Sequence, residues 1–387
     1  MEESCWSDLP DELLIMIKFH LFGQDYSSFH DVCRAWRSGG NPFPLEISPW
    51  QSHIPIAQTP WLVYFEEEDH VLNVSHPLCK SNLIEISGLS ESRICCSRDG
   101  WLLMWQFSGR VFFLNPFIKT RIELPDFPRE PWDYPSCGSM DVFLPSLSFS
   151  SPPISSDCVV FGISSSRDHD EAVSICIIRR GEASWTIHQR RDNNIPFVLS
   201  MANPVYHNQI FYCLGEKGHL GIFDPHKDHW TIQRPYISSF VLNIEDVNSF
   251  FVQCNGNLFL VLQGHMGKGV FVFVLDLDRM IWNQVQHLED YMFFLSDQIS
   301  FSAKTVEGFN DMGNKIYFPI FPPTWDGSGC GGDIISCVFY SMNTDGYHFF
   351  GHSHSNGDIS RMIILKNCAW VEPNFVIPSS KELIWGI

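Results

Sequence analysis

A strand–turn–strand unit recurs along most of this chain and limits the folds that are open to it. In its clearest copy, Ile210–Cys213 and Leu220–Asp224 flank a turn, and Trp230–Ile232 follows after a second turn. A polar residue ends the middle strand of this unit, and an aromatic residue six positions later opens the next strand. Because β-branched and aromatic residues favour strands, and no long helical stripe interrupts the copies, the pattern predicts an antiparallel, mainly β domain.

The six-residue offset occurs at four places, and two weaker copies extend the series. The four pairs are Arg179 with Trp185, Asp224 with Trp230, Asp276 with Trp282 and Ser341 with Tyr347, and the weaker copies end at Ser75 and Asn115. Their spacing of roughly 40 to 65 residues brackets the ~50 residues of a kelch-type blade. One four-stranded sheet cannot bury both of its faces, so neighbouring units would cover one another. We therefore predict a β-propeller of about six blades, or seven. The alternative is one or two β-sandwiches whose turns share the same chemistry.

The first forty residues have a helical pattern instead. Asp8 and Pro10 suit the start of a helix, and Gly39–Pro42 ends the pattern. Two apolar stripes lie between them, one formed by Leu13, Leu14, Ile17 and Leu21, the other by Phe29, Val32, Cys33 and Trp36. A hairpin of this size is too small to form its own core, so its stripes pack on the β domain or dock on another protein.

Five prolines between residues 41 and 60 predict a semi-rigid connector after the hairpin. They are Pro42, Pro44, Pro49, Pro55 and Pro60. We therefore divide the chain into a helical domain at 1–40, a linker at 41–59 and a propeller at 60–387.

Two runs in the helical segment resemble the F-box of plant proteins. Trp6–Leu14 reads Trp-Ser-Asp-Leu-Pro-Asp-Glu-Leu-Leu, and Val32–Arg37 reads Val-Cys-Arg-Ala-Trp-Arg. The spacer Phe22–Tyr26 departs from the usual Leu- or Ile-rich middle helix of an F-box. The resemblance implies binding to a Skp-type adaptor and, through it, to a cullin scaffold. Carried over position by position, the adaptor-binding residues would be Leu9, Pro10, Leu13, Leu14, Ile17, Val32, Cys33 and Trp36.

The order of F-box and β region resembles plant F-box proteins with a kelch-like associated domain of unknown function. The residues that carry this resemblance are Asn203–Tyr206, Gly221–Pro225, Lys315–Pro319, Val338–Ser341 and Trp370–Pro373. It implies a substrate-recognition subunit of an SCF-type (Skp–cullin–F-box) ubiquitin ligase, which is not itself an enzyme and holds an unknown protein substrate. The alternative is a propeller-fold hydrolase that acts on a glycan or a small ester, with the N-terminal helices as packing.

Two long irregular segments, 125–139 and 322–333, carry aromatic residues of the kind that anchor a partner. We predict that Trp132, Tyr134 and Trp325 contribute to substrate binding. The alternative is that these side chains pack between blades.

No motif in the chain predicts a metal, a cofactor or a catalytic site. Gly327–Gly332 is rich in glycine but lacks the Lys-Ser/Thr pair of a phosphate-binding loop. Ser97–Trp101 is better explained as a hairpin turn than as the Asp-box of a sialidase. The loop histidines have no Cys or carboxylate partner at a recognised metal-ligand spacing; they are His226, His229, His348, His352 and His354.

Charge and cysteine usage narrow the partners and the compartment. The net charge of −19 would repel phosphate backbones, which argues against a nucleic-acid partner. The start of the chain lacks a secretory signal, and the apolar runs are too short for a membrane helix. The 13 cysteines are scattered and include no CxxC pair, which favours reduced thiols and a cytoplasmic or nuclear protein.

Overall fold

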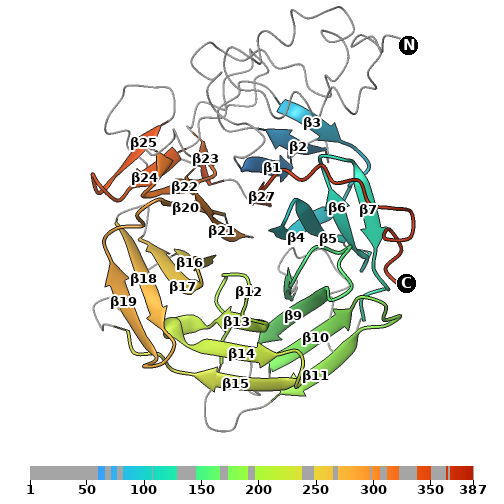
Figure 1. Ribbon diagram of the computed structural model, residues 1–387, viewed down its shortest axis with the longest axis horizontal. Coiled ribbons are helices and arrows are strands. Elements are labelled where there is room, and N and C mark those ends of the chain that lie inside the picture. Colours follow the sequence, from blue (N-terminus) through green and yellow to red (C-terminus); the bar gives the residue numbers. More distant parts are fainter. Residues whose placement is uncertain are drawn as a thin grey trace, which may run out of the picture.

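The computed structural model shows six β-sheets arranged as blades around a common centre (Figure 1). It describes residues 60–65, 71–75, 82–106, 108–128, 145–165, 173–190, 197–237, 248–264, 269–296, 299–305, 312–321, 338–349, 363–364 and 367–386. The mainly β propeller predicted from the repeat is confirmed, with six blades, and the β-sandwich alternative is excluded. The helical domain and the linker predicted for residues 1–59 lie outside the described residues.

Three blades follow one another with four antiparallel strands each, numbered outward from the centre. Blade 2 contains β4 (Ser92–Arg98), β5 (Trp101–Gln106), β6 (Val111–Asn115) and β7 (Thr120–Glu123). Blade 3 contains β8 (Ser146–Phe149), β9 (Val159–Ser165), β10 (Val173–Arg179) and β11 (Thr186–Arg190). Blade 4 contains β12 (Val205–His207), β13 (Ile210–Leu214), β14 (Leu220–Asp224) and β15 (His229–Gln233), with the short 3-10 helix η3 (Glu216–Gly218) between β13 and β14.

Blade 5 repeats this plan, whereas blade 6 departs from it. Blade 5 contains β16 (Asn248–Cys254), β17 (Asn257–Gln263), β18 (Val270–Asp276) and β19 (Ile281–Val285). Blade 6 has the order β21 (Ser300–Lys304), β20 (Tyr291–Leu295), β22 (Lys315–Phe318), β24 (Val338–Ser341) and β25 (Gly346–Phe349). The small pair β23 (Ile320–Phe321) and β26 (Ile363–Ile364) forms a separate ladder.

The β20–β22 ladder of blade 6 is parallel, where the prediction was antiparallel pairing throughout. The hairpin strand β21 pairs with β20 on its inner side, so β22 can only reach the outer side of β20. Blade 6 therefore has an additional strand, β21, at the centre of the ring.

Blade 1 joins the two ends of the described chain. It consists of β27 (Cys368–Val371), β1 (Trp61–Phe65), β2 (Leu72–Ser75) and β3 (Asn82–Ile86). β27 pairs antiparallel with β1, and Trp61 lies opposite Val371. This pairing closes the ring.

Apolar side chains of adjacent blades form the core between them. In β5, five of six residues are buried, because each blade is covered on both faces by its neighbours. Between blades 3 and 4, for example, Phe161 stacks on Phe211 with ring centroids 4.6 Å apart. The outermost strand β11 contains no buried residue and faces solvent.

The six polar residues of the repeat end the strand next to the outermost strand, one in each blade. Three of them build the following turn in the same way: one side-chain oxygen accepts hydrogen bonds from two backbone N–H groups in the turn. These three are Asn115, Asp224 and Asp276. The turn chemistry therefore explains why the offset recurs.

Residues 372–386, which we call the C-terminal strap, continue from β27 across blade 2 to blade 3 (Figure 1). Asn374 Nδ2 donates to the Asp99 carbonyl of blade 2 at 2.8 Å. At the far end, the Gly181 N–H of blade 3 donates to the Trp385 carbonyl at 3.0 Å. The strap thus links three blades. In the part of the chain that the structure describes, no helix is long and apolar enough to cross a membrane.

Candidate functional site

The residues assigned above to the adaptor and the substrate all lie outside the described residues. These are Leu9, Pro10, Leu13, Leu14, Ile17, Val32, Cys33 and Trp36 in the first segment, and Trp132, Tyr134 and Trp325 in two internal segments. Their roles stay predictions. Phe127, at the start of the first irregular segment, is described: it is buried and packs edge-on against Trp105 and Trp185.

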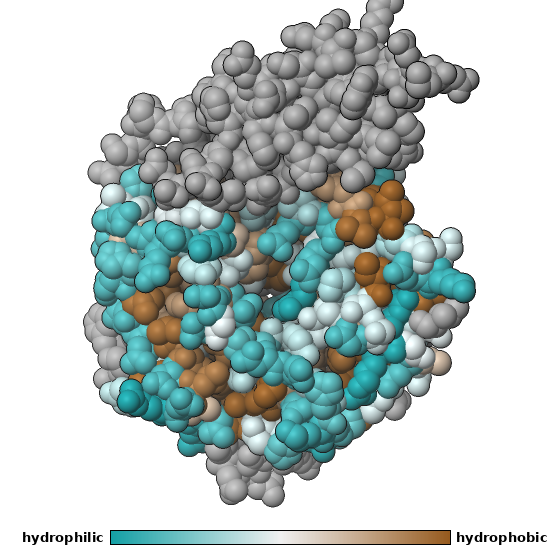
Figure 2. All heavy atoms as spheres, in the orientation of Figure 1, coloured by the Kyte–Doolittle hydropathy of each residue, from teal (hydrophilic) through white to brown (hydrophobic). Residues whose placement is uncertain are grey.

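The centre of the ring holds a cavity of about 880 Å³, which we call the channel. Blades 2 to 6 contribute to its wall together with Glu372, the first residue after β27, and Figure 2 shows the channel as a hollow in the middle of one face. Its volume lies within the range of pockets that bind ligands, and concave sites of this kind are the usual binding sites of proteins. The channel is therefore the candidate functional site among the described residues.

Serine hydroxyls are the commonest polar groups in the channel wall. Side chains two positions apart on a strand share one face, which brings alternate serines of β8 and of β21 to the wall. The serines are Ser97, Ser146, Ser148, Ser164, Ser165, Ser200, Ser249, Ser296, Ser300 and Ser302. The sequence analysis missed them. The serine–apolar–serine alternation in both strands is the signal that could have found them.

Several polar groups of the wall hold the blades together. Ser97 Oγ donates to the Trp370 carbonyl at 2.5 Å and ties blade 2 to blade 1. Ser302 Oγ donates to the Gln253 carbonyl at 2.9 Å and ties the additional strand β21 to blade 5. These bonds fix the wall, because each hydroxyl is held by a backbone group of a different blade.

A β-bulge in β4 provides a further connection across the channel. The register of β4 against β5 shifts between Ile94 and Cys96, which takes Cys95 out of the ladder. The Cys95 carbonyl then accepts a hydrogen bond from Asn203 Nδ2 of blade 4. Blades 2 and 4 are not neighbours in the ring, so this bond links two blades that are separated by blade 3.

Arg98, Asp99 and Glu372 gather where β4 and β27 end. Arg98 Nη1 donates to the Ser150 carbonyl at 3.1 Å, and Nη2 to the Tyr206 carbonyl at 3.4 Å. Burial raises the pKa of the Glu372 carboxyl, Asp99 adds to the rise, and Arg98 opposes it. The Glu372 side chain is nevertheless open to the channel, since the cavity lies beside it. A ligand with hydrogen-bond donors would therefore meet acceptors here.

The two cysteines of the wall are not set up as nucleophiles. Burial raises the pKa of the Cys95 thiol to about 12 and raises that of Cys96 as well. Only the thiolate is a strong nucleophile or a good metal ligand, so both side chains act as small apolar groups.

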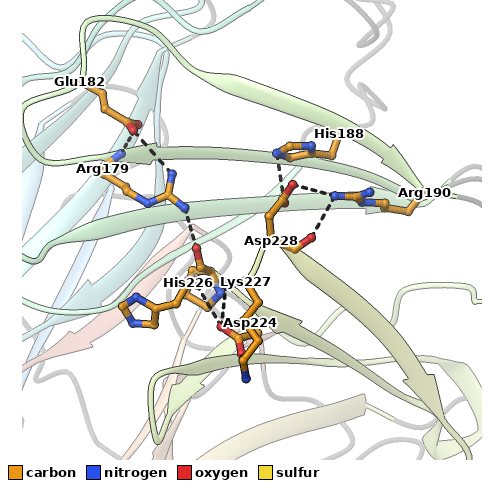
Figure 3. Close-up of polar contacts among 9 residues, drawn as sticks. Arg179, Glu182, His188, Arg190, Asp224, His226, Lys227 and Asp228 are labelled. Atoms are coloured by element: carbon orange, nitrogen blue, oxygen red, sulfur yellow. Dashed lines mark hydrogen bonds and ion pairs between the residues drawn. The ribbon is translucent and has the colours of Figure 1, made fainter.

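The histidines of the β14–β15 turn lie at the outer rim, far along the blade from the channel strand β12. Figure 3 shows that Asp228 of this turn contacts blade 3, with Nε2 of His188 at 3.2 Å and Nη2 of Arg190 at 2.9 Å. His226 and His229 are exposed, as expected for loop residues. Among the described residues, no group of three or more His, Cys, Asp or Glu side chains could hold a metal ion.

Comparisons with known proteins agree with this architecture and extend to the N-terminal segment. Residues 66–350 match the family model described as the KIB1-4 beta-propeller. The F-box/kelch-repeat protein At1g57790 of Arabidopsis thaliana is 29% identical over 381 residues, which cover 96% of this chain and 95% of that protein. The F-box protein At4g00893 of the same plant is 26% identical and covers 89% of this chain and 81% of its own length. Among solved structures, that of YjhT is similar with a TM-score of 0.35 and 11% identity, over 67% of this chain and 82% of YjhT.

Proposed function

Because this chain belongs to the KIB1-4 β-propeller family and is a plant F-box protein, we propose that it is the substrate-recognition subunit of an SCF-type ubiquitin ligase. The observation that carries the proposal is the match to F-box relatives over most of the chain, 96% of it for one relative and 89% for another. In this role the F-box binds a Skp-type adaptor and, through it, a cullin scaffold, in the cytoplasm or the nucleus.

The proposed mechanism is proximity. A receptor that holds its substrate close to a ubiquitin-conjugating enzyme raises the effective concentration of the substrate and needs no catalytic residue of its own. A rigid ring suits this task, because the six blades and the strap hold the channel in one geometry. We place the substrate, a protein, over the channel and the loops around it.

The hydrolase alternative gains no support from the channel wall. Its cysteine thiols stay protonated at neutral pH, since burial raises their pKa values. The hydroxyls of Ser97 and Ser302 donate to backbone carbonyls instead of to a base. We therefore retain the receptor as the single proposed function.

Replacing two apolar residues of the F-box tests the adaptor assignment. The double substitution Leu13→Ala and Trp36→Ala should weaken binding to a purified Skp-type adaptor by ~2–4 kcal/mol, as the loss of large apolar anchors does. Isothermal titration calorimetry measures this loss, and far-UV circular dichroism should show an unchanged β domain. Gln24→Ala, in the spacer that departs from the F-box pattern, is the matched control and should bind normally. Full-strength binding by the double variant would refute the assignment.

Replacing the two aromatic segments tests where the substrate binds. We propose that Trp132, Tyr134 and Trp325 form part of the substrate surface. Each segment is replaced by a short Gly-Ser linker, over residues 129–139 and 322–333, which spares the buried Phe127. Substrates are identified by affinity purification from a plant extract, with adaptor recovery as the control. At least one replacement should lose substrates and keep the adaptor. A full substrate set from both folded variants would place the site elsewhere.

A further inference from the structure

The two mouths of the channel differ in the polar groups that they present. The inner strands of blades 1 to 5 run in the same direction, because these blades repeat one order of antiparallel strands. The ends of these strands meet at one mouth, where Ser97 of β4 donates to the Trp370 carbonyl of β27. The beginnings of the strands therefore surround the other mouth. We call this second opening the donor mouth, and its wall includes Arg93, Ser146, Ser164, Ser165, Ser200 and Ser249.

The serine hydroxyls of the donor mouth retain hydrogens that can be donated to a ligand. Ser165 Oγ accepts the Leu199 N–H at 2.8 Å, and this bond also brings the segment before β12 to the end of β9, beside the start of β8. Ser200 Oγ accepts the Ala202 N–H at 3.2 Å. A hydroxyl that accepts through its oxygen still has its own hydrogen to donate. Three more hydroxyls are half-buried and have no hydrogen-bond partner among the described residues: Ser146, Ser164 and Ser249.

The opposite mouth presents acceptors instead. Within the described part of the wall, the carboxylates are those of Asp99 and Glu372, and both lie where β4 and β27 end. The Arg98 guanidinium lies there as well, but its two Nη atoms donate to backbone carbonyls. An anion would therefore meet like charges at that mouth and hydrogen-bond donors at the donor mouth.

Arg93 gives the donor mouth a positive charge. It is the second residue of β4, it is half-buried, and it lines the channel. A guanidinium with hydroxyls around the same opening can form charge-assisted hydrogen bonds to an oxyanion. A carboxylate suits this set better than a phosphate dianion. One arginine balances one negative charge, and the net charge of −19 opposes the entry of a second.

We propose that the donor mouth binds the C-terminal carboxylate of a substrate protein. A chain end can enter a cavity of about 880 Å³ without a turn, whereas an Asp or Glu side chain would need a loop to reach it. Met201, which is 83% exposed and part of the same wall, offers an adaptable apolar contact to the residues that precede the carboxylate. The protein source of the carboxylate rests on the proposed function, and the preference for a carboxylate rests on the wall alone.

Selection of peptides with a free C-terminus tests the proposal. A library of short random sequences at the C-terminus of a carrier protein is selected on the purified full chain. The enriched sequences are synthesised both as the C-terminal acid and as the C-terminal amide, and fluorescence anisotropy measures their binding. The acid should bind at least about tenfold more tightly than the amide, because the amide lacks the charge that strengthens each hydrogen bond.

Variants of the wall then locate the carboxylate. Arg93→Gln should weaken the acid about tenfold or more and leave the amide nearly unchanged, and Arg93→Lys should recover part of the loss. Ser249→Ala should weaken the acid several-fold, and it carries the comparison if Arg93→Gln does not fold in thermal unfolding. Arg234→Gln is the matched control, since Arg234 is exposed and lies outside the channel wall. It should bind both peptides normally.

The outcomes separate this inference from the proposed function. No enriched sequence, equal binding of acid and amide, or an equal loss of both in the wall variants would overturn the inference. N-acetylglycine that displaced the peptide at equal concentration would assign the mouth to a small carboxylic acid and would overturn the C-terminal source. Adaptor binding is measured on the same preparations. Its loss alone would contradict the proposed function, whereas normal adaptor binding with failed peptide selection would overturn only the inference.

Discussion

At the scale of single residues, Glu372 shows how the ring changes the chemistry of one side chain. Its carboxyl follows β27 directly and lines the channel, where burial and Asp99 raise its pKa above the ordinary value of 4.5. At a pH between the ordinary pKa and the raised pKa of the folded state, Glu372 of the folded protein binds a proton that the unfolded protein has already released. By linkage, the free energy of unfolding then falls as the pH rises through this interval.

Glu372→Gln should therefore raise the free energy of unfolding at pH 7 and leave it unchanged at a pH below the ordinary pKa.

Glu382 should affect stability in the opposite direction. Hydrogen bonds from Ser379 lower the pKa of its carboxyl, so Glu382 stabilises the folded state at neutral pH and loses this effect on acidification. Glu382→Gln should thus be less stable than the unaltered protein at pH 7, and the difference should shrink as the pH falls. Urea unfolding at several pH values measures both. If both variants changed the free energy of unfolding at pH 7 in the same direction, the result would contradict these opposite pKa shifts.

At the scale of the elements, the sequence allowed the turns at the strand ends to be predicted, but it did not allow the contacts between blades to be predicted. The offset in the repeat depends on a side chain that bonds its own turn, such as Asp276 with the two N–H groups that follow it. It therefore predicted the strand ends and the number of blades. The channel wall was missed because its contacts join distant segments: Asn203 and the Cys95 carbonyl lie 108 residues apart. The parallel ladder of blade 6 was missed because the predicted unit contained hairpin connections only, whereas the chain passes from β20 through β21 before it reaches β22.

The β4–β5 turn offers a test of how tightly the strap is seated. Gly100 has a φ of +81°, and a Cβ there would meet the Asn374 Cβ at 2.2 Å. Gly256, in the corresponding turn of blade 5, has a φ of +75° and no neighbouring atom within 4 Å of such a Cβ. Gly256→Ala should cost ~1 kcal/mol of stability from backbone strain alone. Gly100→Ala should cost ~2–4 kcal/mol, because it also displaces the strap. Equal costs in urea unfolding would show that the strap is loosely held.

At the scale of the whole molecule, stability depends on the closure of the ring. β27 supplies the inner strand of blade 1, and Trp370 Nε1 donates to the Leu295 carbonyl of blade 6 at 3.0 Å. This one short strand thus belongs to blade 1 and also holds blade 6. The strap adds contacts to blades 2 and 3. Removal of β27 would therefore open the ring at the point where both of its ends meet.

A pair of fragments tests the closure. Residues 60–387 should fold alone with one cooperative thermal transition, since the described strands begin at Trp61 and the ring closes within this fragment. Residues 60–366 lack β27 and the strap, and they should show a broad or absent transition in calorimetry. The result would be contradicted if the shorter fragment unfolded as cooperatively as the longer one. An insoluble longer fragment from a sound full chain would show that the helical domain belongs to the core.

The pairing of Trp61 with Val371 also sets the order of events during synthesis. The two residues lie more than three hundred positions apart, so at about 5–20 residues per second the ribosome makes β27 roughly 15–60 s after β1. For that time the edge of β1 that pairs with β27 is unpaired, and blades 2–6, whose strands all precede β27, can assemble only as an open arc. A nascent chain that stops early therefore keeps an exposed strand edge for chaperones and proteases to find. Once β27 has been made and has paired with β1, this edge is covered and chaperones and proteases can no longer bind it.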